Sequence, residues 1–155
     1  MKIQELIKKN GIIIDLKSTD KMEALNSIAR FLCSINGLTN TEEVCAKIIE
    51  RETEMSTGIG FGIAIPHGRL NGINKLCMAA ARSAEGMEFD ALDDQPVHLI
   101  FMMISPANTS EEHTSALSSL SRIMSYEEVR SKLLDASTPD EFLDIITKAE
   151  NKYIE

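Results

Sequence analysis

The sequence has few aromatic residues and no excess of basic ones. Among its 155 residues there is no tryptophan, and aromatic side chains make up 5% of the chain. Single-stranded nucleic acids bind on stacked aromatic side chains, so this composition argues against that function. The 16 basic residues are outnumbered by 24 acidic ones, and the formal net charge is −8. We therefore expect no nucleic-acid partner, although backbone N–H groups with one arginine could still hold a small anion.

The chain also lacks a disulfide framework and a long apolar segment. Its three cysteines, Cys33, Cys45 and Cys77, are odd in number and far apart, which fits neither paired disulfides nor CxxC metal ligands. We expect them to be reduced, buried thiols. The apolar run from Leu99 to Ile104 is far shorter than the roughly 20 residues of a membrane-spanning helix. The first residues, MKIQELIKKNG, lack the apolar core of a secretion signal, so we expect a cytoplasmic protein without membrane insertion.

Helical and strand-like periodicities alternate along the chain. Helices are predicted at about residues 3–8, 20–36, 41–53, 109–124, 127–135 and from 138 onward. Strand-like runs occupy residues 12–15, 62–65, 76–83 and 97–105. The last of these runs is apolar almost throughout, as expected for a central strand covered on both faces. Helices before, between and after a small sheet predict an α/β sandwich with helices on both faces, formed by a single domain over residues 1–155.

Local signals place several helix ends. Ser18 or Thr19 is predicted to cap the second helix, on which Met22 faces inward, and Gly37 to end it. Thr138, followed by proline and then glutamate three residues after the cap, marks the start of the last helix.

The segment GIGFGIAIPHG, from Gly58 to Gly68, combines glycines, a short strand pattern and a histidine. It lacks the lysine and hydroxyl of a P-loop, and its third glycine comes too early for a dinucleotide-binding GxGxxG motif. Residues 56–60 are therefore either a turn and edge strand that need glycine or a backbone nest for an anion. Pro66 and Gly68 flank His67 and present its ring at a rigid strand end, which suits a nucleophile.

The other two histidines have different settings. His98 lies within the apolar 97–105 run, where a buried, hydrogen-bonded imidazole is the simpler interpretation. His113 begins a helical stripe of apolar residues, so it is either a core residue or part of a site where that helix meets the sheet. No HExxH, CxxC, two-histidine-one-carboxylate or GxSxG pattern accompanies them, so we expect neither a metal nor another cofactor, and no serine hydrolase.

The segment ERETEMSTGIGFGIAIPHG resembles the enzyme IIA domain of the bacterial phosphoenolpyruvate:sugar phosphotransferase system, in its fructose/mannitol/nitrogen-regulatory class. The resemblance extends over essentially the whole chain, through MKIQELI, IIIDLKSTDKMEAL, FDALDDQPVHLIFMMISP and EEHTSALSSLSRIM. It implies a mixed sheet of about five strands flanked by helices, in agreement with the α/β sandwich.

The resemblance also implies a site. His67 would be the phosphoryl acceptor, His113 a second active-site histidine that supports the phosphoryl group, and Arg51 the site arginine. Thr57, Gly58 and Gly60 would lie near the phosphoryl group. The sequence departs from the family at Phe61, where many relatives carry a small polar residue such as asparagine.

Two functions within this family stay open. In the first, the protein is a phosphotransferase that accepts a phosphoryl group from the carrier protein phospho-HPr and passes it to a IIB cysteine for fructose/mannitol-type sugar uptake. In the second, it is a nitrogen-regulatory IIA protein, and phosphorylation of His67 controls binding to regulatory partner proteins. A non-catalytic anion-binding module is a third class, which the full set of motifs disfavours.

Overall fold

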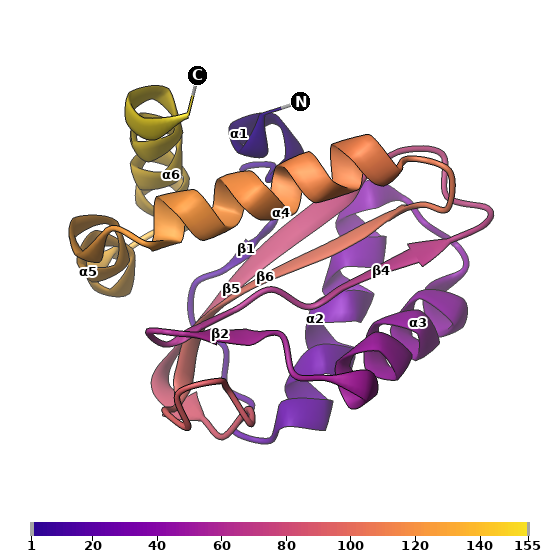
Figure 1. The fold of residues 1–155 in the computed structure, drawn as a ribbon, viewed down its shortest axis with the longest axis horizontal. Helices are drawn as coiled ribbons and strands as arrows, with labels where there is room; N and C mark the ends of the chain where they lie inside the picture. The colour runs from indigo at the N-terminus through magenta and orange to yellow at the C-terminus, as the bar shows by residue number, and fades with distance from the viewer. Residues whose placement is uncertain (1, 155) are drawn as a thin grey trace.

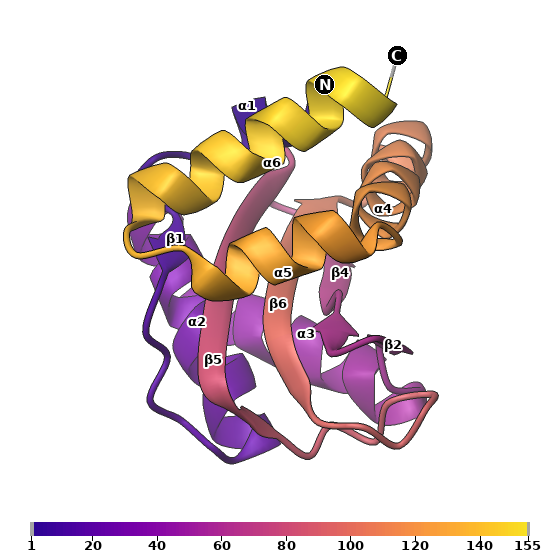
Figure 2. The same ribbon diagram turned by 90° about the vertical axis from the view of Figure 1, so that its left-hand side faces the viewer.

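The structure is a computed structural model that describes residues 2–154, shown in two views in Figures 1 and 2. In chain order its elements are α1 (Ile3–Leu6), β1 (Ile12–Ile13), α2 (Lys21–Asn36), α3 (Thr41–Glu54), β2 (Gly58–Gly60), β3 (Ile63–Ala64), β4 (His67–Leu70), β5 (Cys77–Met87), β6 (Val97–Pro106), α4 (Ser110–Met124), α5 (Glu127–Asp135) and α6 (Pro139–Tyr153). No helix within this part of the chain is both long and apolar enough to cross a membrane.

The strands form one mixed sheet of six strands, where about five were expected. Their order is β1-β5-β6-β3-β2, and β4 pairs with β6 beyond the end of β3. The β5–β6 and β2–β3 pairs are antiparallel, whereas β1 runs parallel to β5, and β3 and β4 run parallel to β6. Every residue of β6 except His98 is buried, which confirms its prediction as the central strand.

Helices cover both faces of the sheet, as predicted. Figures 1 and 2 show α2 and α3 on one face and α1, α4, α5 and α6 on the other. Alternate residues of β6 enter the two cores: Ile100 and Met102 pack with α2 and α3, whereas Phe101 and Met103 pack with the remaining helices. This alternation follows from the two-residue period of a strand, and the two apolar layers give the α/β sandwich its stability.

Several local predictions are confirmed. Gly37 ends α2 in the left-handed conformation, with φ 67°. The Thr138 hydroxyl accepts a hydrogen bond from the backbone N–H of Glu141 at the start of α6. Cys33, Cys45 and Cys77 are free and buried.

Other predictions about local structure are wrong in detail. Asp20, not Ser18 or Thr19, caps α2 by accepting the N–H of Glu23 at 3.0 Å. Met22 was expected to face inward, but 41% of it is exposed. The strand expected over residues 12–15 is shortened to Ile12–Ile13.

The largest departure lies in the glycine-rich segment. It forms three short strands in place of the single strand expected over residues 62–65. Phe61 and Gly62 both have positive φ, 58° and 79°, and turn the chain between β2 and β3. His67 consequently opens β4, a new strand along β6, and does not end the preceding one.

Candidate functional site

Strand β4 and the beginning of α4 bring His67 and His113 together. His67 lies opposite Met103 of β6 in the parallel β4–β6 pair. The chain leaves β6 at Pro106 and enters α4 at Ser110, which carries His113 back over the end of the strand. The two imidazole ring centroids are 5.2 Å apart, with the rings inclined at 67°. The sequence indicated both histidines but left open whether they meet.

The two histidines line an open cleft of about 350 Å³ between α3, β4 and α4. The cleft walls carry both positive and negative side chains. Its lining residues are Lys47, Glu50, Arg51, Glu54, His67, Gly68, Arg69 and His113. Two imidazoles and three cations, opposed by two carboxylates, give the cleft an excess of positive charge that suits a small anion.

His67 is held in one tautomer by the backbone. Its Nδ1 atom lies 2.9 Å from the carbonyl oxygen of Ile65. Because a carbonyl oxygen can only accept, Nδ1 carries a proton and Nε2 keeps the lone pair of the neutral ring. Burial lowers the pKa of His67; the hydrogen bond to Ile65 opposes this shift, and the nearby charge of Arg51 adds to it. At neutral pH the ring is therefore a nucleophile through Nε2.

His113 is buried, with 4% of the residue exposed. Its Nδ1 atom is hydrogen-bonded to the Ser105 hydroxyl, which leaves Nε2 as the ring nitrogen available to the cleft. Burial lowers the pKa of His113 to about 4, and the positive charge of Arg69, with that of His67 when it is protonated, acts in the same direction. His113 is therefore uncharged at neutral pH and can act there as a hydrogen-bond donor or acceptor.

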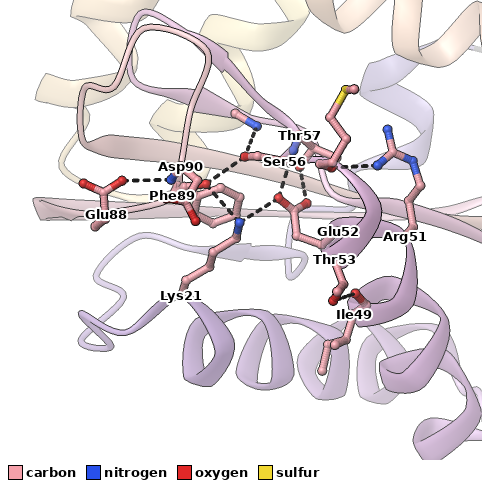
Figure 3. Close-up of polar contacts among 12 residues, drawn as sticks. Lys21, Ile49, Arg51, Glu52, Thr53, Ser56, Thr57, Glu88, Phe89 and Asp90 are labelled. Atoms are coloured by element: carbon pink, nitrogen blue, oxygen red, sulfur yellow. Dashed lines mark hydrogen bonds and ion pairs between the residues drawn. The ribbon is translucent and has the colours of Figure 1, made fainter.

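Arg51 and Glu52, neighbours in the last turn of α3, point apart (Figure 3). Arg51 lines the cleft, and its Nη1 atom donates to the carbonyl oxygen of Met55 at 2.7 Å. Glu52 is buried: its carboxylate accepts from the backbone N–H of Thr57 at 2.8 Å and from its hydroxyl at 2.5 Å, and it pairs with Lys21 Nζ at 3.1 Å. The buried Glu52 carboxylate thus fixes the backbone that follows α3, and the Met55 carbonyl in this backbone holds the Arg51 guanidinium.

Thr57, Gly58 and Gly60 do not line this cleft. Thr57 binds Glu52, and a Cβ atom at Gly58 would lie 2.7 Å from the Cβ of Ala91, so this position has no room for a side chain. Gly60 has φ 101°, a conformation that favours glycine. Of the two interpretations of residues 56–60, these contacts favour a turn and an edge strand that need glycine.

Several residues in or next to the cleft were not indicated by the sequence, and two of them, Arg69 and Ser105, bear on the histidines. Arg69 lies two residues after His67 on β4, and therefore on the same side of the strand. Its Nη1 atom donates to the Ser110 hydroxyl at 2.9 Å, near the start of α4. The alternation of β4 would have indicated Arg69 had that strand been predicted. The second feature, Ser105, had a weaker signal, as a hydroxyl at the end of an apolar run.

The remaining singled-out residues lie outside the cleft lining. The hydrogen bond expected for His98 is present, with Nδ1 3.0 Å from the Ser83 carbonyl oxygen, but the residue is half-buried and not buried as expected. Phe61 is 71% exposed, and the guanidinium of Arg130 lies 4.6 Å from its ring centroid. Residues 2–154 contain no group of three or more side chains that could together hold a metal ion.

Comparison with known proteins finds relatives that belong to one family. Residues 5–149 match the family described as "Phosphoenolpyruvate-dependent sugar phosphotransferase system, EIIA 2". Over 148 residues, 96% of the chain, the sequence is 36% identical to the "PTS system fructose-specific EIIABC component" of Bacillus subtilis, and it spans 23% of that longer protein.

Two solved structures extend the comparison. The nitrogen regulatory protein IIA-Ntr of Neisseria meningitidis is 33% identical, with a TM-score of 0.87 over 93% of this chain and 98% of that one. Enzyme IIA-mannitol of Escherichia coli, solved in complex with phosphorylated enzyme IIB-mannitol, is 25% identical, with a TM-score of 0.77 over 92% of this chain and 99% of that one.

Proposed function

The chain belongs to the EIIA 2 family of the phosphoenolpyruvate-dependent sugar phosphotransferase system, and we propose that it carries a phosphoryl group on His67. The observation that supports this most directly is the tautomer of His67, whose Nδ1 is held by the Ile65 carbonyl while its Nε2 is free. A nucleophilic nitrogen in a cleft with Arg51, Arg69 and His113 matches the needs of phosphoryl transfer.

The proposed step moves the phosphoryl group from a phosphohistidine of an HPr-type carrier protein. The Nε2 lone pair of His67 forms the new P–N bond while the donor P–N bond breaks, and the electron pair of that bond returns to the donor ring. The Nδ1 proton stays on His67, held by Ile65. The product is a phosphoimidazolium, from which the phosphoryl group can leave again in a second transfer because the ring departs as a neutral imidazole.

Catalysis of this step consists of positioning and charge stabilisation. The planar guanidinium of Arg51 can bind two phosphoryl oxygens at once, and the bond to the Met55 carbonyl holds it at the cleft. Arg69 adds a second positive charge on the side of His67, and His113 offers a ring nitrogen. These groups can stabilise the transferring phosphoryl without a metal or other cofactor.

Two roles are compatible with this site. The E. coli relative was solved with phosphorylated enzyme IIB-mannitol, which favours a IIB cysteine as the next acceptor and a role in fructose/mannitol-type uptake. The alternative is a nitrogen-regulatory role, in which the phosphorylation state of His67 controls binding to regulatory proteins; the similarity to IIA-Ntr supports it. In either role we propose one cytoplasmic domain over residues 1–155.

The test supplies phosphoenolpyruvate, enzyme I and HPr, and measures intact mass. We expect the protein to gain one acid-labile phosphoryl group, and His67→Ala to abolish this gain. His98→Ala is the matched control, since His98 lies away from the cleft, and it should still be phosphorylated. Phosphorylation of the His67→Ala variant would overturn the assignment. Offering the phosphorylated protein to a IIB domain and to nitrogen-regulatory partners then separates the two roles.

A further inference from the structure

Ser105 is a polar residue at the end of the apolar strand β6, and it is completely buried. Burying a hydroxyl is costly unless it forms a hydrogen bond. The Ser105 hydroxyl contacts Nδ1 of His113 and lies 3.5 Å from the carbonyl oxygen of Gly68. It therefore joins β6, β4 and α4 directly beneath the cleft.

The two contacts compete for the single hydroxyl proton. If Ser105 donates to Gly68, its oxygen must accept a proton from Nδ1, and Nε2 of His113 would present a lone pair to the cleft. If Ser105 donates to Nδ1, Nε2 carries the proton. The contact with Gly68 is longer than the roughly 2.5–3.0 Å of ordinary O–H···O bonds, whereas the contact with His113 is short. The distances therefore favour donation to His113.

We propose that Ser105 is a positioning residue for phosphoryl transfer, because its hydroxyl holds His113 in the tautomer that directs an Nε2–H donor into the cleft. The proposal rests on the proposed transfer through His67. A neutral imidazole without such a partner exchanges between two tautomers, and the other tautomer would place a lone pair against the phosphoryl oxygens. Outer partners of functional histidines set tautomer and ring orientation in the same way in metal sites.

The role of Ser105 matters because the His113 ring is uncharged. The ring is uncharged at neutral pH, because its burial and the neighbouring charge of Arg69 lower its pKa. A charged imidazolium would donate from both nitrogens, and no partner would be needed to choose between them. For a neutral ring, the direction of one buried hydroxyl decides whether the cleft contains a donor or an acceptor.

The first test reads the tautomer directly in the unphosphorylated protein at pH 7. Two-bond ¹H–¹⁵N NMR spectra should show His113 protonated at Nε2 and unprotonated at Nδ1. In Ser105→Ala the Nδ1 and Nε2 shifts should move toward a mixture of tautomers, while Ser105→Thr, which keeps a hydroxyl, should retain the native pattern. Ser83→Ala is the matched control, since Ser83 is also buried in a strand but its hydroxyl accepts from the N–H of Gly86.

The second test measures the rate of phosphorylation by phospho-HPr. We expect Ser105→Ala to slow it about 10-fold, by analogy with the loss of an outer partner of a functional histidine. Ser83→Ala should leave the rate unchanged. In the His113→Ala background the Ser105 substitution should have no further effect, because its action passes through His113.

The outcomes separate the two proposals. A native His113 protonated at Nδ1, or a Ser105→Ala variant with native tautomer and native rate, would overturn the role of Ser105. The native spectrum alone decides this if Ser105→Ala does not fold. A protein that shows the expected tautomers but is never phosphorylated would overturn the function proposed for His67, while leaving Ser105 as the residue that orients His113.

Discussion

Lys21→Met should destabilise the protein strongly, because it leaves the carboxylate of Glu52 buried without its cation. The Glu52 side chain has no exposed surface and that of Lys21 is 14% exposed, with 3.1 Å between Nζ and Oε2. Methionine keeps most of the apolar length of lysine, so the chief losses are the charge and the hydrogen bond from Nζ to the Phe89 carbonyl oxygen at 2.9 Å. Removing one member of a buried ion pair costs about 3–5 kcal/mol.

The lower end of this range is the expected value. Two hydrogen bonds from Thr57 still stabilise the Glu52 carboxylate after the substitution. Glu52→Gln should cost less, about 2 kcal/mol, because an amide can still accept the Thr57 N–H and the remaining Lys21 is not fully enclosed. In the double variant neither charge remains buried, so its cost should be well below the sum of the two single costs.

Urea unfolding of the four proteins at pH 7 measures this double-mutant cycle. A loss of about 3 kcal/mol corresponds to a fall of roughly 6–12 °C in melting temperature for a chain of this length. Lys17→Met is the matched control, because Lys17 pairs with Asp15 at 2.8 Å on the surface and should hardly change the midpoint. A Lys21→Met variant as stable as this control, or single costs that simply add, would refute the reasoning.

Three further predictions concern other parts of the molecule. The pKa of His113 is 6.5 in the unfolded chain and about 4 in the folded protein. The neutral ring therefore adds up to about 3 kcal/mol to the free energy of unfolding, which is fully present above pH 6.5 and is lost as pH falls toward 4. Urea unfolding at pH 7 and 4.5 should therefore show a smaller acid loss for His113→Gln, and an equal loss contradicts this origin. Phe61→Asn should keep or slightly raise the melting temperature. Asparagine tolerates φ 58°, and the relief of about 1 kcal/mol of backbone strain offsets the lost contact with Arg130. A fall in melting temperature as large as that of Phe61→Val would contradict this. Arg51→Lys should leave the fold intact but slow phosphorylation by phospho-HPr about tenfold or more, since lysine lacks the planar fork, and a native rate would remove Arg51 from the site.

Much of the fold could be predicted because its signals are local. The continuous apolar run of β6, the helical spacing of α4 and the cap at Thr138 each act within a few residues. Strands β2 and β4 carry no such signal, because they have three and four residues and exist only through pairing with other strands. The cap of α2 was misplaced by one or two residues, since serine, threonine and aspartate are all good caps.

The candidate site, like the fold, was predictable only where its signals are local in the sequence. His67 was evident from its flanking proline and glycine and from the family resemblance, and His113 from its place at the start of an apolar stripe. Arg69 depended on the unpredicted strand β4. Lys21 and Glu52 lie 31 positions apart in the sequence, and nothing in either segment indicates that they form a buried pair.

The sequence by itself determined the α/β class, the central strand, the negative net charge and the choice of His67 as the proposed nucleophile, because composition, periodicity and a compact motif are properties of neighbouring residues. Only the tertiary structure decided the chemistry around that nucleophile. Which nitrogen of His67 is free depends on the Ile65 carbonyl, and the donor direction of His113 depends on Ser105. The glycines of GIGFG serve backbone geometry and close packing against Ala91, outside the cleft. The Ser105–His113 bond joins β6 to α4, whereas the Ile65–His67 bond is local and depends on the backbone path from β3 into β4; both are set only once the sheet and helices have packed.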